Sequence, residues 1–323
     1  MDKHYQPKFQ EEYSAKIPAL TLLTSLGWTF LSPKQIMDYR GYKQDEVVLR
    51  PVLREELSKR SFMAGGKTCQ LSEKALANLI SQVCSPALNE GLLKANERMY
   101  NHLLYGIAVT EFVDGKKVNP TIALIDWEHP ENNQFHFTEE FTVLRSGGVE
   151  TRRPDIVCFV NGIPLAVIEA KSPAGHGKKG PTIDEGISQS IRNQFNDEIP
   201  QLFVYSQLLL SINGHDGRYG TCHTPMKFWA AWREEDITDP QMYALRNHPL
   251  STEQIHALFD HRPSVDLKWY QQLIDGGELA VSGQDKLLIS LLSPERLLEM
   301  TRLFTLFDKK TGKIVARYQQ VFG

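Results

Sequence analysis

The chain has 323 residues, of which 41% are hydrophobic and 23% charged, and its formal net charge is -3. This composition is typical of a soluble globular protein with one large domain or two ordinary ones, and the charge gives no whole-chain argument for nucleic acid binding. No run of about 18 apolar residues exists, and the polar start lacks the apolar middle of a secretory signal. We therefore expect a cytoplasmic protein without membrane contact. Four scattered cysteines indicate neither disulfides nor a zinc site.

The first third of the chain shows apolar residues at helical spacing. The stretches concerned are residues 17 to 28, 32 to 41, 45 to 60, 71 to 83 and 88 to 106. Gly27 and Gly106 end the first and last stretches, and Ser72 and Asn89 are candidate N-caps of the last two. The pattern predicts a helical region over residues 1 to 105.

Near residue 106 the pattern changes to short segments rich in Val, Ile, Phe and Thr, separated by turn residues. The expected strands are residues 106 to 113, 119 to 127, 133 to 144, 154 to 160 and 164 to 170. A Gly/Lys-rich loop follows, and then a helix over residues 182 to 198, an apolar strand over 202 to 212 and a shorter strand over 226 to 232. This order predicts a mixed α/β core over residues 106 to 237.

Residues 238 to 305 return to helical patterns and read as a helical linker, which completes an α/β fold with helical additions at both ends. The end of the chain reads as a hairpin that halts within an apolar, aromatic stretch. This ending favours a piece of a longer protein.

Asp155, Glu169 and Lys171 stand in the hairpin formed by two of the most apolar predicted strands. Glu169 and Lys171 share a face because side chains alternate along a strand. Asp155 joins them if it lies directly opposite Glu169, so that the residue numbers of each facing pair sum to 324. This pairing requires a three-residue turn over residues 161 to 163 or a bulged equivalent. A two-residue turn over residues 161 to 162 would pair Asp155 with residue 168 instead.

Two carboxylates among apolar side chains repel each other and lose hydration unless a cation lies between them. Oxygen ligands suit Mg²⁺ or Mn²⁺, which can polarise a phosphoryl oxygen and lower the pKa of a bound water. Lys171 would orient that water and stabilise developing charge. The alternative is that Glu169 and Lys171 are solvated at a strand end. Burial of both strands and a following helix that contains Gln189 favour the metal site.

The stretch "RRPDIVCFVNGIPLAVIEAKSP" resembles the PD-(D/E)xK nuclease superfamily, and more closely the N-terminal endonuclease region of the R (restriction, HsdR) subunit of type I restriction enzymes. Nearly the whole chain shares the likeness, including "LIDWEHPENNQFHFTEEF", "ISQSIRNQ" and "TPMKFWAAWREE". The fold implied is an endonuclease domain over residues 1 to 237, with a restriction-endonuclease-like core over residues 106 to 237. Because "ARYQQVFG" is similar to the junction with the family's ATP-driven motor, residues 306 to 323 would be the start of a truncated motor domain.

The resemblance also implies site residues. Asp155 and Glu169 would be metal ligands, Lys171 the catalytic lysine and Gln189 the glutamine of the helix after the core strands. Related nucleases often show Gln-xxx-Tyr there, whereas this chain has Asn193. Many members place a further acid on the first helix. Here Glu12 is the first candidate ligand and Glu11 the second.

The function implied is Mg²⁺-dependent cleavage of unmodified double-stranded DNA, with methyltransferase and specificity subunits as partners. ATP would be used only by the full-length enzyme, because "FMAGGKT" has Ser61 where a phosphate-binding loop requires its first glycine. A basic fringe of phosphate contacts is expected from Arg152, Arg153, His176, Lys178 and Lys179. The alternative function is a nuclease-like module that binds DNA and docks subunits but is inactive in isolation.

Overall fold

The computed structural model describes residues 10 to 173 and 183 to 323, and its centre is a six-stranded sheet. The strands, in sheet order, are β1 (Thr29–Phe30), β8 (Phe135–Glu139), β11 (Ile156–Val160), β12 (Ile163–Ala170), β13 (Leu208–Ile212) and β14 (Gly217–Gly220). Strands β8, β11 and β12 form an antiparallel meander, whereas β12 with β13 and β1 with β8 pair in parallel. The predicted α/β fold with a mixed sheet is confirmed.

The parallel pair β12 and β13 requires a crossover connection. It contains α6 (Ile183–Arg192) and α7 (Pro200–Phe203), and α6 packs on both strands. A Cβ atom at Gly186 would overlap the Oγ of Ser211 and lie 3.4 Å from the Cβ of Glu169. Glycine therefore lets this helix approach the sheet closely, next to one of the predicted ligands.

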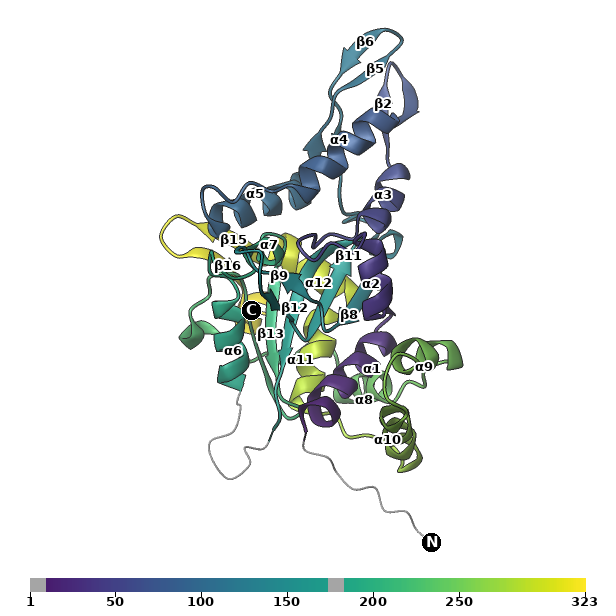
Figure 1. Cartoon of the computed structure of the whole chain (residues 1–323), viewed down its shortest axis with the longest axis vertical. Coiled ribbons are helices and arrows are strands. Elements are labelled where there is room, and N and C mark those ends of the chain that lie inside the picture. Colours follow the sequence, from purple (N-terminus) through teal and green to yellow (C-terminus); the bar gives the residue numbers. More distant parts are fainter. Residues whose placement is uncertain (1–9, 174–182) are drawn as a thin grey trace.

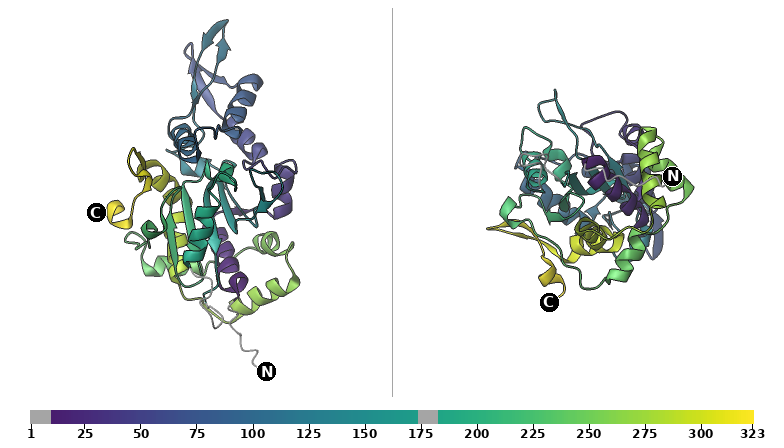
Figure 2. Two further views of the ribbon diagram at one scale, coloured as in Figure 1. Left: turned by 60° about the vertical axis from the view of Figure 1, so that its left-hand side comes forward. Right: turned by 90° about the horizontal axis from the view of Figure 1, so that it is seen from below.

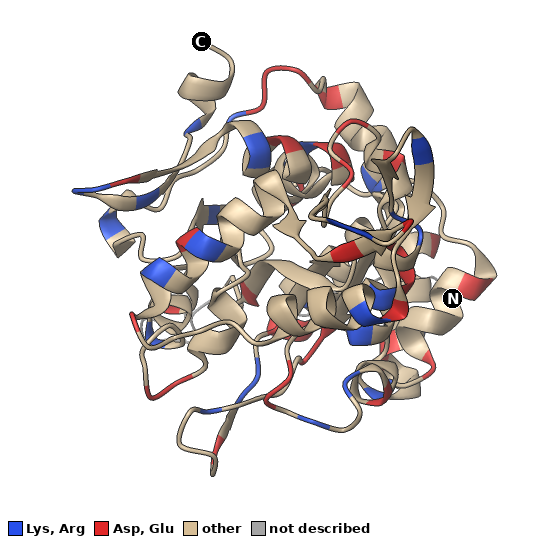
Figure 3. Ribbon diagram, turned by 90° about the horizontal axis from the view of Figure 1, so that it is seen from above, with Lys and Arg blue, Asp and Glu red and all other residues tan. Residues whose placement is uncertain are grey.

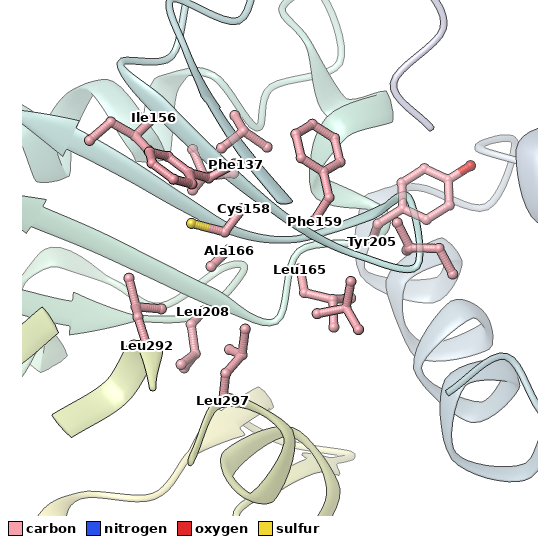
Figure 4. Packing of buried hydrophobic residues seen from close by; sticks show 14 of the residues in the cluster. Phe137, Ile156, Cys158, Phe159, Leu165, Ala166, Tyr205, Leu208, Leu292 and Leu297 are labelled. Carbon is pink, nitrogen blue, oxygen red and sulfur yellow. The ribbon is translucent and has the colours of Figure 1, made fainter. Parts of the chain in front are cut away.

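The helices over residues 238 to 305, which the sequence pattern predicts to be a linker, pack against the core. Helix α11 (Gly283–Leu292) contacts α1 (Ile17–Ser25), β14 and α12 (Pro294–Leu303). Figure 4 shows Leu292 and Leu297 of these helices next to Leu208 of the sheet. Local periodicity predicted the helices, but it could not show that they cover the sheet.

The N-terminal region also departs from the all-helical expectation, because β1 joins the main sheet and a hairpin of β2 (Ser61–Ala64) and β3 (Lys67–Gln70) interrupts the helices. Figures 1 and 2 show an arm, built around α4 (Glu73–Cys84) and α5 (Leu92–Tyr105), that extends away from α8 (Asp239–Arg246), α9 (Thr252–Phe259) and α10 (Ser264–Asp275). Gly65 and Gly66 have φ of +58° and +76° and form the β2–β3 turn. The sequence "FMAGGKT" is thus a hairpin, in agreement with the rejection of a phosphate-binding loop.

Two strand predictions are corrected. The segments at 106 to 113 and 119 to 127 form separate two-stranded sheets and do not join the main sheet. Residues 226 to 232 contain a short 3₁₀ helix (Met226–Phe228) and a single bridge between Tyr219 and Ala230, while β14 was not predicted. Helix α5 begins at Leu92 after Gly91, so Asn89 is not its cap.

The remaining elements follow the predicted positions or lie in connections. They are a π-helical turn (Glu12–Lys16), α2 (Pro33–Tyr39), α3 (Arg50–Ser58), α4 (Glu73–Cys84), α5 (Leu92–Tyr105), β4 (Ile107–Ala108), β5 (Glu111–Val113), β6 (Lys116–Val118), β7 (Thr121–Ile122), a 3₁₀ turn (Pro130–Asn132), β9 (Val143–Leu144), β10 (Thr151–Arg152), α8 (Asp239–Arg246), α9 (Thr252–Phe259), α10 (Ser264–Asp275), β15 (Thr305–Asp308), β16 (Gly312–Val315) and α13 (Tyr318–Val321). The predicted C-terminal hairpin is confirmed as β15 and β16.

Charges of both signs are scattered over the face drawn in Figure 3. Within residues 10 to 173 and 183 to 323, no helix is long and apolar enough to cross a membrane.

Candidate active site

The sequence requires one register for Asp155 to face Glu169 and favours another for a two-residue Asn-Gly turn, and the β11–β12 hairpin contains both. Near the site, Ile156 faces Ile168, so facing numbers sum to 324 and Asp155 falls opposite Glu169. At the turn, Val160 faces Ile163, and a register shift between these two regions absorbs the difference. The three-residue turn is therefore wrong, whereas the bulged equivalent with residue 155 across from 169 is confirmed.

The turn itself is the two-residue type that Asn-Gly favours. Asn161 and Gly162 have φ of +51° and +80°, as a two-residue hairpin turn of this type requires. The side chain of Asn161 is buried and donates to the carbonyl of Leu124 at 3.0 Å. A Cβ atom at Gly162 would lie 2.6 Å from the carbonyl oxygen of Leu49. The end of the hairpin remote from the charges is thus rigidly fixed.

The two predicted acids lie together at the opposite end of the hairpin. The Oδ2 atom of Asp155 accepts a hydrogen bond from the backbone N–H of Ala170 at 2.8 Å. Glu169 is completely buried, and neither of its carboxylate oxygens has a hydrogen-bond partner in the part of the chain that the structure describes. Burial raises the pKa of Glu169 well above its usual value, and the charge of Asp155 adds to the effect.

Lys171 brings a positive charge to these acids. Its Nζ lies 2.6 Å from the carbonyl oxygen of Ala170, 3.6 Å from Oδ2 of Asp155 and 4.0 Å from Oε2 of Glu11. Its backbone N–H donates to Ile212 of β13 at 2.8 Å, which fixes the residue after β12 ends. The structure therefore gathers Asp155, Glu169 and Lys171 as the sequence predicted.

Of the two upstream acids, Glu11 lies nearer the site. Burial raises the pKa of Glu11, and Asp155 adds to the rise although Lys171 opposes it. Glu12 instead pairs with Lys16 and Arg262, and these two cations outweigh burial and lower the pKa of Glu12. The geometry thus favours the second candidate over the first as the acid next to Lys171.

Helix α6 carries Gln189 one turn after Gly186, the residue that packs against Glu169 and Ser211. Gln189 is half-buried there, and Asn193 is buried with its Oδ1 accepting a hydrogen bond from Arg192 at 3.1 Å. Asn193, which directly follows α6, is thus held by the last residue of that helix.

Ser211 is a site neighbour that the sequence reading missed. It pairs with Glu169 across β12 and β13, and its hydroxyl donates to the carbonyl of Ile183 at 2.8 Å. The sequence feature that could have revealed Ser211 is its place as the single polar residue in the apolar strand "LLLSI".

Of the expected basic fringe, Arg152 and Arg153 lie among the described residues. Arg152 pairs with Glu198, and Arg153 pairs with Glu140, so both guanidinium groups have internal carboxylate partners. His176, Lys178 and Lys179 lie outside the described residues.

The described residues contain no group of three or more His, Cys, Asp or Glu side chains already arranged to hold a metal ion. What fits a cation is the buried pair of Asp155 and Glu169, because Glu169 has no donor to offset the loss of hydration. The Lys171 ammonium is the positive charge next to Asp155.

The sheet thus brings two acids and a lysine together at the end of the β11–β12 hairpin opposite its turn, and oxygen ligands of this kind can bind a divalent cation. The chain matches the family model described as type I restriction enzyme R protein N terminus over residues 8 to 228, and it belongs to this family.

Curated relatives agree with this family assignment. The chain is 28% identical to the HindI endonuclease subunit of Haemophilus influenzae, over 95% of this chain and 26% of the relative. It is 25% identical to the putative MjaIXP endonuclease subunit of Methanocaldococcus jannaschii, over 98% of this chain and 27% of the relative. With the putative MjaVIIP subunit of that organism it shares 30% identity, over 69% of this chain and 17% of the relative. The chain spans about a quarter of the length of the first two relatives.

Proposed function

We propose that this chain is the endonuclease part of a type I restriction enzyme R subunit, which hydrolyses phosphodiester bonds of unmodified double-stranded DNA with a divalent cation. The observation that carries the proposal is the buried, unpartnered carboxylate of Glu169 beside Asp155 and Lys171. The family and the names of the relatives support the same reaction. Oxygen ligands favour Mg²⁺, with Mn²⁺ as a substitute.

Asp155 and Glu169 would hold the cation, and we propose Glu11 in place of Glu12 as the further acid. When bound, the cation would polarise a phosphoryl oxygen and lower the pKa of a water molecule. Lys171 would orient the attacking water and stabilise the charge that develops on the phosphate. Gln189 would face the substrate from α6.

The longer protein would work in a complex. Methyltransferase and specificity subunits would recognise the DNA sequence, and ATP would drive a motor to which residues 306 to 323 lead. In support, the relatives named as endonuclease subunits are about four times as long as this chain.

The test uses the full-length R subunit assembled with its partner subunits and measures cleavage of unmodified DNA with Mg²⁺ and ATP. Asp155→Asn, Glu169→Gln and Lys171→Met should each reduce cleavage by at least about a hundredfold. Glu97→Gln on α5 is the matched control, because it removes a charge on the arm, and it should cleave as wild type does. Undiminished cleavage by all three site variants would refute the proposal. DNA binding without any cleavage by the wild-type complex would instead support the docking module.

A further inference from the structure

Arg262, in the turn between α9 and α10, is surrounded by three carboxylates. Its NH1 atom pairs with Oε1 of Glu12 and lies 3.4 Å from Oδ2 of Asp266, and its NH2 atom pairs with Oε2 of Glu139. The side chain is buried. A planar guanidinium with several donors can hold carboxylates from different elements in a fixed arrangement, which a lysine cannot do as well.

The three carboxylates belong to parts of the chain that are far apart in sequence. Glu12 begins the N-terminal π-helical turn, Glu139 ends β8 and Asp266 lies in the first turn of α10. Tyr13 reinforces the contact, because its hydroxyl donates to Oδ1 of Asp266 at 2.8 Å and its ring lies 5.1 Å from that of Trp269. The C-terminal helices therefore fix the start of the chain against the sheet.

Two of these carboxylate residues are adjacent in sequence to residues that contact the proposed active site. Glu12 directly follows Glu11, whose carboxylate lies 4.0 Å from Nζ of Lys171. Glu139 directly precedes Glu140, whose backbone N–H donates to the carbonyl oxygen of Asp155 at 2.9 Å. Movement at Arg262 would therefore displace both Glu11 and Asp155.

We propose that Arg262 is a positioning residue of the active site, which holds Glu11 and Asp155 where they bind the cation. The inference rests on the proposed function, and it makes the helical region over residues 238 to 305 a structural part of that site. Residues that orient ligands typically change metal affinity by about 10- to 100-fold when they are lost.

The test measures the Mg²⁺ concentration that gives half-maximal cleavage by the assembled full-length enzyme. It also measures the Mn²⁺ concentration that half-saturates the thermal stabilisation of the R subunit without DNA. Arg262→Met should raise both concentrations by about tenfold or more, and Arg262→Lys should recover part of the loss. Asp266→Asn leaves the arginine in place and should give a smaller rise in the same direction.

Arg246→Met is the matched control, because Arg246 is equally buried, lies in the same helical region and pairs with Asp285 at 3.3 Å. It should lower stability without changing either metal concentration. If Arg262→Met does not fold, Arg262→Lys and Asp266→Asn decide the question. If every folded variant of Arg262 and Asp266 needs the same metal concentrations as Arg246→Met, the inference is overturned. In that case the proposed function still stands if Asp155→Asn abolishes cleavage. Undiminished cleavage by Asp155→Asn, Glu169→Gln and Lys171→Met would instead refute the proposed function.

Discussion

Two buried glutamates in the same sheet have opposite surroundings. Glu139 on β8 pairs with Arg262 and with His261, whose Nε2 lies 2.7 Å away. Glu169 on β12 has no hydrogen-bond partner among the described residues. Hydrogen-bonded cations offset the free energy that burial costs Glu139, whereas no hydrogen-bond donor among the described residues does so for Glu169. A buried carboxylate without a donor is typical of a functional site.

Replacing Glu169 by Met should therefore stabilise the metal-free protein by about 1 to 3 kcal/mol while it abolishes cleavage. The matched change Glu139→Met should destabilise the protein by about 3 to 5 kcal/mol, because Arg262 loses a buried partner. Urea denaturation without divalent ions measures both. A loss of stability in Glu169→Met would show that its carboxylate has a stabilising partner.

The sequence predicted which residues meet at the site better than how the chain brings them together. The charges of Asp155 and Glu169 required one register and the Asn-Gly turn required another, and a bulge satisfied both. Glu11 and Glu12 are adjacent, so only the rotation of the first helical turn decides which faces Lys171. That rotation depends on Arg262, 250 residues after Glu12, and could not be predicted locally.

At the scale of elements, the packing of α6 on the sheet depends on Gly186. Gly186→Ala should destabilise the protein by about 1 to 3 kcal/mol and reduce cleavage, because the new methyl group would meet Ser211 and push the helix from Glu169. Gly147→Ala is the control, since no atom lies within 4 Å of its added Cβ. Adding Ser211→Ala should recover part of the loss, as expected for residues in contact. Additive losses measured by denaturation would contradict this packing.

The hairpin of β15 and β16 is attached to the core by a buried lysine. Nζ of Lys313 donates to the carbonyl of Ser206 at 3.1 Å and to Oε1 of Gln207 at 2.6 Å. Burial lowers the pKa of Lys313 from 10.5 to about 8. Between these pH values the unfolded chain binds a proton that the folded chain does not, so the contribution of Lys313 to stability improves as the pH rises.

The stability of wild type relative to Lys313→Met should therefore increase by about 2 kcal/mol between pH 7.5 and 9.5. Both proteins share their other titrating groups, so the difference in free energy of unfolding isolates this lysine. A difference that is constant with pH would show that Lys313 remains protonated in the folded protein throughout this range.

Helices and strands were easier to predict from the sequence than the elements with which they pair or pack. Periodicity identified α9, α10 and α12, because the spacing of apolar residues along an amphipathic helix can be recognised from neighbouring residues alone. Residues 226 to 232 were misread as a strand because they are apolar. Trp229 packs against Gly220 and Ala230 forms a single bridge to Tyr219, whereas Met226 and Phe228 are exposed. Pairing and packing depend on residues far apart in the chain, which one sequence does not reveal.

On the scale of the whole molecule, the C-terminal helices and the predicted nuclease core share one hydrophobic core. Leu288 and Leu291 of α11 are completely buried, and the indole N–H of Trp28 donates to the carbonyl of Leu292 at 2.7 Å. A boundary at residue 237 would therefore cut through the core, although it matches the change in local sequence pattern.

A chain that ends at residue 237 should accordingly lose cooperative unfolding and bind the dye ANS, because the surface that α11 covers becomes exposed. A chain that ends at residue 317 keeps α11, α12 and the β15–β16 hairpin, so it should unfold cooperatively. Thermal denaturation followed by near-ultraviolet circular dichroism distinguishes the two. Cooperative unfolding of the shorter chain would mean that residues 238 to 303 form a separate unit. In that case Arg262 would reach the active site from a neighbouring domain.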